Sequence, residues 1–165
     1  MLSEEIKNLV GQVIGTSVFR IEKESVQRFA KAVGETNPLY YSEAYAADSR
    51  YGSIIAPPGY VSSVWFWENL DGITSETDGD QPPGMFGLIN AMMEAGYKSV
   101  LDSGIDYEFF APVKVGDTLT ASIVVKDMKE RKVEEGSMVF LVTDTTYTNQ
   151  NGEKVAASRW MTIHR

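Results

Sequence analysis

Hydrophobic and polar positions alternate along the C-terminal third of the chain. Apolar residues stand at every second position from Leu119 to Val125, and positions 138, 140 and 142 repeat this spacing. A period of two predicts half-buried β-strands, and Asn-Gly at 151–152 is typical of a tight hairpin turn. Since these strands follow one another, with further strands expected at 105–110 and 155–163, we expect an antiparallel meander.

The pattern changes in the first 50 residues, where most segments have a helical period. Residues 13–22 are rich in β-branched residues and predict one strand. In 23–33 apolar residues recur at i, i+3, i+4 and i+7, which predicts a helix with one buried face, and Gly34 follows as its C′ residue. Short helices are expected at 3–10 and at 42–49, the second with Ser42 as its N-cap.

A different kind of helix is expected at 60–70. This segment has apolar or aromatic residues on nearly every face, which indicates a helix buried on most sides, with a sheet curled around it. Residues 71–84 are acidic and rich in glycine and proline, which predicts a loop, and a short helix is expected at 91–97. We therefore expect one α+β domain over 1–165, with a loop-rich insertion at about 71–104.

Composition excludes several kinds of function. The 165 residues include no cysteine and a single histidine, His164, so a thiol nucleophile, a disulfide framework and a multi-histidine metal site are excluded. The formal net charge of −8 argues against nucleic acid as a partner. Neither a basic leader segment nor an apolar run of about 20 residues occurs, so we expect no signal peptide, no membrane span and a cytoplasmic protein.

Two motifs carry a family resemblance. Residues 34–42 read Gly-Glu-Thr-Asn-Pro-Leu-Tyr-Tyr-Ser, and residues 107–120 read YEFFAPVKVGDTLT. The first resembles the hydratase motif of the MaoC-like family, Gly-Asp-x-Asn-Pro-aliphatic-His-x-Asp or Ser, and the second is similar to that family's F-x-x-P-V-x-x-G-D-x-L signature. Ala-Pro-Pro at 56–58 also fits the stretch that opens the family's central helix. The resemblance covers most of the chain and implies a hotdog fold, a curved antiparallel sheet wrapped around a central helix.

The chain departs from the family at the two positions that matter most for chemistry. The resemblance implies that Asp and His handle the water and the α-proton of a 2-enoyl or 3-hydroxyacyl thioester, but these positions are Glu35 and Tyr40 here. Glutamate displaces the carboxylate, and a shift of about 1 Å can lower a rate by about 10²-fold. Tyrosine, with a reference pKa of about 10, is a poor base at neutral pH. Asn37 is expected to brace the turn with the proline that follows it.

The resemblance also suggests why the pair is absent. Many members of the family are double hotdogs or pairs of different subunits, in which one half carries Asp and His. The other half shapes the acyl channel and often has Tyr at the His position. We therefore expect a non-catalytic subunit of an enoyl hydratase or 3-hydroxyacyl dehydratase, with a long or bulky acyl thioester as substrate. Such a chain alone would be inactive.

The start of the helix at 60–70 is a candidate for binding the thioester carbonyl. Free backbone N–H groups at a helix N-terminus favour developing negative charge. Since the two prolines before it have no N–H, Gly59 and Tyr60 would supply the donors. An ordinary proline-rich helix start gives the same sequence. No cofactor or metal is expected, and the thioester would belong to coenzyme A or an acyl carrier protein.

Three other functions stay open at this point. The chain is compatible with a self-sufficient homodimeric hydratase that uses Glu35, with Tyr40 as a hydrogen-bond donor. It is also compatible with a non-enzymatic acyl-CoA-binding hotdog and with a thioesterase. A single hotdog leaves a sheet edge and apolar surface exposed. We therefore expect a homodimer, or a heterodimer with a catalytic hotdog subunit.

Overall fold

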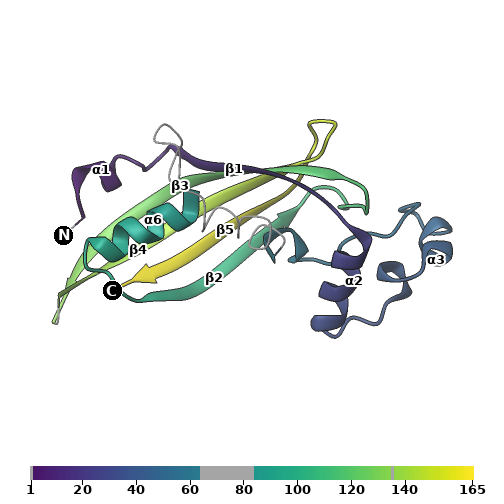
Figure 1. Cartoon of the computed structure of the whole chain (residues 1–165), viewed down its shortest axis with the longest axis horizontal. Helices are drawn as coiled ribbons and strands as arrows, with labels where there is room; N and C mark the ends of the chain where they lie inside the picture. The colour runs from purple at the N-terminus through teal and green to yellow at the C-terminus, as the bar shows by residue number, and fades with distance from the viewer. Residues whose placement is uncertain (1, 64–83, 135) are drawn as a thin grey trace.

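The computed structural model describes residues 2–63, 84–134 and 136–165 (Figure 1). The elements, in chain order, are α1 (Glu4–Lys7), β1 (Val13–Arg20), α2 (Lys23–Ala32), the 3-10 helix η1 (Pro38–Tyr40), α3 (Glu43–Ala47), α6 (Gly84–Glu94), β2 (Val100–Phe109), β3 (Thr118–Val133), β4 (Gly136–Thr148) and β5 (Lys154–His164). Among these residues, no helix is long and apolar enough to cross a membrane.

The strands form one antiparallel sheet in the order β1-β3-β4-β5-β2. The expected meander is confirmed, because β3, β4 and β5 are consecutive in the chain and neighbours in the sheet. Gly152 takes a left-handed φ of 78° in the β4–β5 turn, a conformation that costs glycine little, which explains the Asn-Gly signal. β1 and β2 form the two borders of the sheet (Figure 1).

The core lies on one face of the sheet, called the inner face here; the opposite face is the outer face. Burial alternates along β3, where Leu119, Ala121, Ile123 and Val125 are at most 3% exposed. These residues belong to the same buried cluster as Leu88 and Met92 of α6, which lies across the inner face (Figure 1). Burying a leucine-sized side chain contributes roughly 1.5–3 kcal/mol, so this contact fixes α6 on the sheet.

The structure corrects the expectations for the middle of the chain. Residues 60–63 are helical, while the rest of the expected helix at 60–70 and the expected loop at 71–84 lie almost entirely outside the described residues. The described part of the stretch 71–104 is helix and strand over much of its length rather than loop, and α6 starts earlier than the helix expected at 91–97. Glycines and apolar residues on several faces of α6 concealed its period.

The elements before residue 50 agree better with the expectations. β1 and α2 begin at the expected residues, and Gly34 after α2 has a left-handed φ of 79°. Ser42 caps α3, because its Oγ accepts a hydrogen bond from the Tyr45 N–H at 3.2 Å. α1 is shorter than the expected 3–10. Residues 22–60, called the helical extension here, carry α2, η1 and α3 beyond one end of the sheet (Figure 1).

Candidate functional site

The motif residues form a turn that is held by local hydrogen bonds. The Asn37 side-chain oxygen accepts a hydrogen bond from the Leu39 N–H at 3.0 Å and so caps η1. The Tyr41 hydroxyl donates to the backbone carbonyl of Glu35 at 2.8 Å, and Gln27 of α2 donates to the Tyr41 carbonyl at 3.1 Å. The turn therefore keeps its shape through the backbone of Glu35 and the side chains of Asn37 and Tyr41.

The side chains at the two catalytic positions of the motif have different surroundings. Glu35 is exposed, whereas Tyr40 is partly buried. Burial raises the pKa of Tyr40, and the nearby Glu35 carboxylate and Tyr51 phenol raise it further. Arg50 donates a hydrogen bond to the Tyr51 hydroxyl, and its guanidinium carbon lies 4.7 Å from the centre of the Tyr51 ring. This cluster keeps the Tyr40 hydroxyl protonated at neutral pH, so it can donate a hydrogen bond.

Gly59 and Tyr60 lie where the extension returns to the sheet. Gly59 has a left-handed φ of 84°, and the buried ring of Tyr60 meets Phe29 edge-on, with ring centres 5.6 Å apart. The Tyr60 N–H donates to the Pro57 carbonyl at 3.1 Å and closes a turn. The expectation that Tyr60 offers a free amide is therefore wrong for this structure. Gly59 stays a candidate donor.

A pair of hydroxyl groups next to Gly59 was missed in the sequence. The Ser62 Oγ donates to the Gly59 carbonyl at 2.9 Å and shares a second hydrogen bond with the Tyr107 hydroxyl of β2. On the inner face, burial raises the pKa of Tyr147 to about 12, and its hydroxyl lies 3.5 Å from Ser158 Oγ. Because Ser62 and Tyr107 are far apart in the sequence, no local motif indicated their contact.

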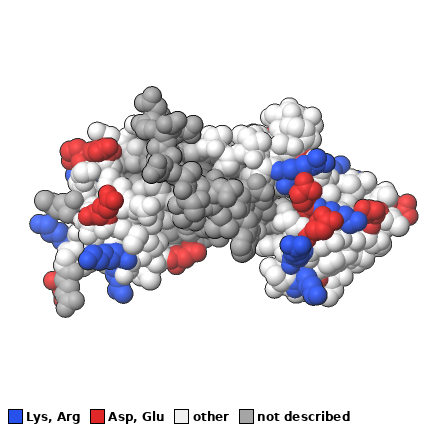
Figure 2. All heavy atoms as spheres, viewed as in Figure 1, with Lys and Arg blue, Asp and Glu red and all other residues white. Residues whose placement is uncertain are grey.

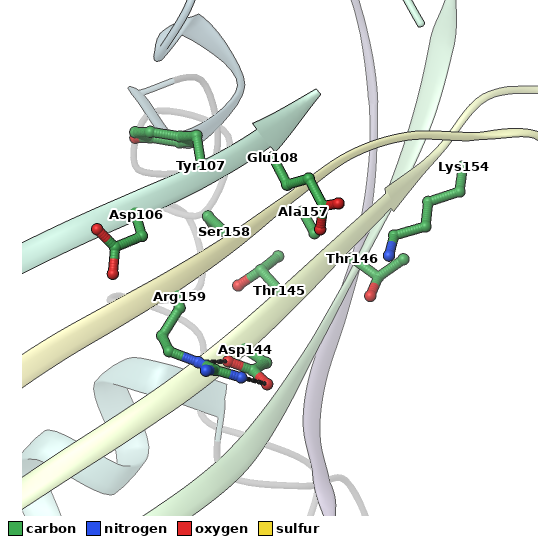
Figure 3. Close-up of a pocket in the computed structure, with 10 residues that line it drawn as sticks. All are labelled: Asp106, Tyr107, Glu108, Asp144, Thr145, Thr146, Lys154, Ala157, Ser158 and Arg159. Carbon is green, nitrogen blue, oxygen red and sulfur yellow. Dashed lines mark hydrogen bonds and ion pairs between the residues drawn. The ribbon is translucent and has the colours of Figure 1, made fainter. Parts of the chain in front are cut away.

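A separate hollow of about 350 Å³ opens on the outer face (Figure 3). The residues that line it come from β2, β4 and β5: Asp106, Tyr107, Glu108, Asp144, Thr145, Thr146, Lys154, Ala157, Ser158 and Arg159. The Arg159 guanidinium makes a bidentate ion pair with the Asp144 carboxylate, at 2.7 and 2.8 Å (Figure 3). The hollow contains neither Glu35 nor Tyr40, so it is distinct from the motif turn.

His164 does not join the motif turn either. It lies at the C-terminal end of β5, at the end of the sheet away from α2 and α3 (Figure 1). Its side chain is buried, its Nε2 is 3.0 Å from the Thr162 hydroxyl, and burial lowers its pKa. Sequence order had already separated His164 from the motif, and the structure separates the two in space.

A metal site requires several ligand side chains in a close arrangement. Within the described part of the chain, no group of three or more His, Asp or Glu side chains is arranged to hold a metal. On the face shown in Figure 2, basic and acidic side chains are interspersed at both ends of the molecule. The chemistry that the motif turn offers is hydrogen-bond donation by the protonated Tyr40.

Comparisons with known proteins agree with the motifs. Residues 8–158 match the family model described as FAS1-like, dehydratase domain region. The chain is 29% identical over 136 residues to a probable enoyl-CoA hydratase alpha subunit of Thermomonospora curvata, covering 82% of this chain and 42% of that protein. It is 24% identical over 166 residues to the 3-oxo-4,17-pregnadiene-20-carboxyl-CoA hydratase alpha subunit of Mycobacterium tuberculosis, covering 94% and 50%. The chain thus spans half or less of the length of these relatives.

Solved structures confirm the hotdog fold. The ChsH1–ChsH2 complex of M. tuberculosis matches with a TM-score of 0.71 at 19% identity, over 96% of this chain and 90% of that chain. A MaoC-like dehydratase matches with a TM-score of 0.70 at 20% identity, over 96% of this chain and 43% of that chain. At these identities the likeness shows the fold alone.

Proposed function

Because the chain belongs to the family of FAS1-like dehydratase domain regions, among MaoC-like hotdog proteins, we propose that it is a subunit of an acyl-thioester enoyl hydratase or 3-hydroxyacyl dehydratase. In this proposal it shapes the acyl-binding site while a partner hotdog subunit supplies the Asp/His pair. Two relatives are named as alpha subunits of hydratases, which supports a function shared between chains.

The state of Tyr40 is the observation that carries the proposal. A general base works best when its pKa lies near the operating pH. The pKa of Tyr40 is instead raised above its usual value by burial, by Glu35 and by Tyr51. Tyr40 therefore holds its proton at neutral pH and cannot take one from water.

Glu35 is the remaining candidate base, and its backbone rather than its carboxylate is fixed. The Glu35 N–H donates to the Ala30 carbonyl at 2.9 Å, and its own carbonyl accepts from Tyr41. The carboxylate extends from this turn into solvent. An exposed carboxylate has no fixed aim toward a substrate, which makes the structural role of Glu35 the better supported one.

The roles proposed for this chain and for its partner follow from the chemistry of hydration. Water adds its oxygen to C3 of the enoyl thioester, C2 receives a proton, and negative charge develops on the thioester oxygen in between. The partner's Asp and His would activate the water and deliver the proton. In this chain the Gly59 N–H is the proposed donor to the thioester oxygen, and the protonated Tyr40, on the motif turn, is proposed as a second hydrogen-bond donor.

A bulky acyl group is the proposed substrate class. One relative is named for a pregnadiene-carboxyl thioester. A subunit without catalytic side chains leaves more room for the acyl group. Activity of the complete complex is expected to rise with acyl size from a four-carbon to a bulky 2-enoyl-CoA, and a preference for the short substrate would contradict this part of the proposal.

The direct test is hydration of a 2-enoyl-CoA by the purified chain, followed as loss of enoyl absorbance. We expect no turnover above the uncatalysed rate. Turnover that Glu35→Gln abolishes, while the matched surface variant Glu24→Gln retains it, would establish a self-sufficient hydratase instead. Thermal stabilisation by the acyl-CoA without turnover, with or without any partner, would favour a non-enzymatic binding protein.

A further inference from the structure

The turn that contains Gly59 leaves one amide open. The Tyr60 N–H donates to the Pro57 carbonyl at 3.1 Å, and Gly59 between them has a φ of 84°. Proline at the second position of a turn and glycine with a positive φ at the third are typical of type II. None of the described residues accepts a hydrogen bond from the Gly59 N–H. What this amide can bind therefore depends on where the turn lies relative to the sheet.

The carbonyl of Gly59 is the group through which the turn is held. It accepts the Ser62 N–H at 3.3 Å and the Ser62 hydroxyl at 2.9 Å. Packing contributes little at the glycine itself, because a Cβ added there would meet only the Phe29 ring, at 3.9 Å, apart from its chain neighbours. The Ser62 hydroxyl thus makes the shorter of the two hydrogen bonds that hold the Gly59 main chain.

Tyr107 in turn holds the Ser62 hydroxyl. A serine hydroxyl has one proton, and Ser62 uses it for the Gly59 carbonyl, so Tyr107 must be the donor in the hydrogen bond that the two hydroxyls share. The bonds therefore run in one direction, from Tyr107 through Ser62 to Gly59. Hydrogen bonds in such a chain strengthen one another.

The sheet gives Tyr107 a fixed place. Tyr107 belongs to β2 and stands opposite Ser158 of β5. Its ring packs against the core and stacks on Phe109, with ring centres 5.7 Å apart and an angle of 15° between the ring planes. Groups on a regular element are positioned more precisely than groups on a loop. Tyr107 is therefore a fixed point to which the Gly59 turn is attached.

We infer that Tyr107 and Ser62 are positioning residues, whose hydrogen bonds hold the Gly59 N–H at the place where a thioester oxygen can reach it. This inference rests on the proposed function, in which Gly59 is the donor to that oxygen. Donors that stabilise a developing oxyanion lie about 2.7–3.1 Å from it, so a small displacement of the turn is enough to lose the contact. Neither hydroxyl contacts the thioester in this arrangement.

Four variants test this chain of hydrogen bonds. Tyr107→Phe removes one hydroxyl and keeps the ring, Ser62→Ala removes the other, and Ser62→Thr keeps a hydroxyl. Ser63→Ala is the matched control, because Ser63 Oγ donates in the same way to the Tyr60 carbonyl, at 2.8 Å. In a proton–nitrogen NMR spectrum of the free chain, we expect Tyr107→Phe and Ser62→Ala to shift and broaden the Gly59 amide cross-peak. Ser62→Thr and Ser63→Ala should leave it near the wild-type position.

Infrared difference spectra of a bound 2-enoyl-CoA, isotope-labelled at the thioester carbonyl, report on the hydrogen bond itself. A donor to this oxygen lowers the carbonyl stretching frequency, and we expect Tyr107→Phe and Ser62→Ala to lose most of the lowering. Their affinity should fall about twofold to tenfold, the effect of one lost hydrogen bond. Since Tyr107 acts through Ser62, the double variant is expected to bind no more weakly than Ser62→Ala alone.

Melting curves confirm that each variant is folded. A Gly59 cross-peak that is the same in Tyr107→Phe and in the wild type would overturn the inference, and so would additive losses of affinity in the double variant. A bound wild-type complex whose carbonyl frequency equals that of the free thioester would instead refute Gly59 as the donor of the proposed function. The cross-peaks would then decide by themselves whether Tyr107 and Ser62 hold the turn.

Discussion

Tyr40 and Glu35 stand at the positions where the family motif has histidine and aspartate, and two substitutions would restore those residues. The turn that holds them depends on Asn37, Tyr41 and the backbone of Glu35, so their side chains can be changed without loss of that support. A positioned acid or base contributes typically 10²–10⁴-fold to a rate. We expect Glu35→Asp combined with Tyr40→His to raise 2-enoyl-CoA hydration by the chain at least about 10²-fold above its background.

The control for this gain is Tyr40→His combined with Glu35→Asn, which keeps the imidazole and removes the carboxylate. If both double variants stay at background, the chain alone lacks more than the pair, and the partner must also complete the thioester site.

Asn37 is expected to act on stability rather than on chemistry. Its side chain caps η1 through the Leu39 N–H. Loss of such a cap costs about 1 kcal/mol, so Asn37→Ala should lower the free energy of unfolding by this amount in a urea titration. Asn37→Asp keeps a cap oxygen and should retain most of the stability; an equal loss in both variants would assign another role to the amide.

His164 gives stability a dependence on pH. Burial lowers its pKa in the folded state below the unfolded value of about 6.5. Below that pH the unfolded chain binds a proton that the folded chain does not, so stability is expected to fall as the pH drops from about 6.5, by up to about 1.4 kcal/mol per pH unit. The difference in unfolding free energy between wild type and His164→Phe, measured from pH 8 to 5, should be constant at the upper end and shift in favour of the variant below pH 6.5. A difference that does not change with pH would contradict this account.

At the scale of elements, the Glu130 carboxylate joins several segments at the end of the sheet away from the helical extension. Glu130 of β3 accepts hydrogen bonds from the Tyr97 hydroxyl at 2.6 Å, from Ser137 of β4 at 3.0 Å and from the Leu2 N–H at 3.3 Å. These bonds join the N-terminal segment, the α6–β2 connection and the β3–β4 hairpin. A hydrogen bond to a charged group contributes about 1.5–3 kcal/mol.

Tyr97→Phe removes the hydrogen bond to Glu130 and the 3.1 Å contact between the Tyr97 and Ser137 hydroxyls. Because Tyr97 is 3% exposed, we expect a loss of about 1–2 kcal/mol in unfolding free energy. Tyr45→Phe, at a tyrosine that is 54% exposed, is the matched control and should change stability little. Equal effects of the two substitutions would show that the hydroxyl of Tyr97 is not what stabilises this end.

The elements that sequence predicts best are those whose periodicity is simple. The alternation in β3 and the one-faced pattern of α2 each come from a single buried face, and α2 was predicted close to its observed bounds. β3 begins close to the expected residue but continues to Val133, past the expected end at Val125, because an irregularity between Val125 and Asp127 interrupts the alternation. α6 has buried residues together with glycines and was mostly missed. The start of β2 was also missed, because a bulge between Asp102 and Gly104 interrupts its alternation.

In the candidate site, too, some features were predictable from the sequence and others were not. The motif located Glu35, Asn37 and Tyr40 on one turn because they are neighbours in the sequence. Tyr51 acts on Tyr40 from outside the motif, and Ser62 contacts Tyr107 across a separation of 45 positions; nothing in a single sequence specifies such contacts.

At the scale of the whole molecule, the helical extension and the sheet are joined at few points. The extension leaves the sheet at Ile21, whose carbonyl accepts from the Gly116 N–H at 2.9 Å, and returns where the Ala56 N–H donates to the Val113 carbonyl at 2.8 Å. Much of the motif turn between these points is exposed. We expect the amide protons of 31–37 to exchange with solvent at least about tenfold faster than those in the middle of β4, measured by hydrogen–deuterium exchange.

Uniform protection across both regions would show that the extension opens only with global unfolding. A partner subunit that covers the extension should slow exchange there selectively, which separates binding at this end from binding elsewhere.

The self-supporting turn at 34–42 has a consequence for how such proteins change over time. In the genetic code, glutamate and aspartate codons differ at one nucleotide, as do those of tyrosine and histidine. Since the turn is held by Asn37, by Tyr41 and by main-chain groups, neither replacement would have to be accompanied by a rebuilt loop. Lineages can therefore lose or regain the acid–base pair by two point mutations while the turn keeps its shape.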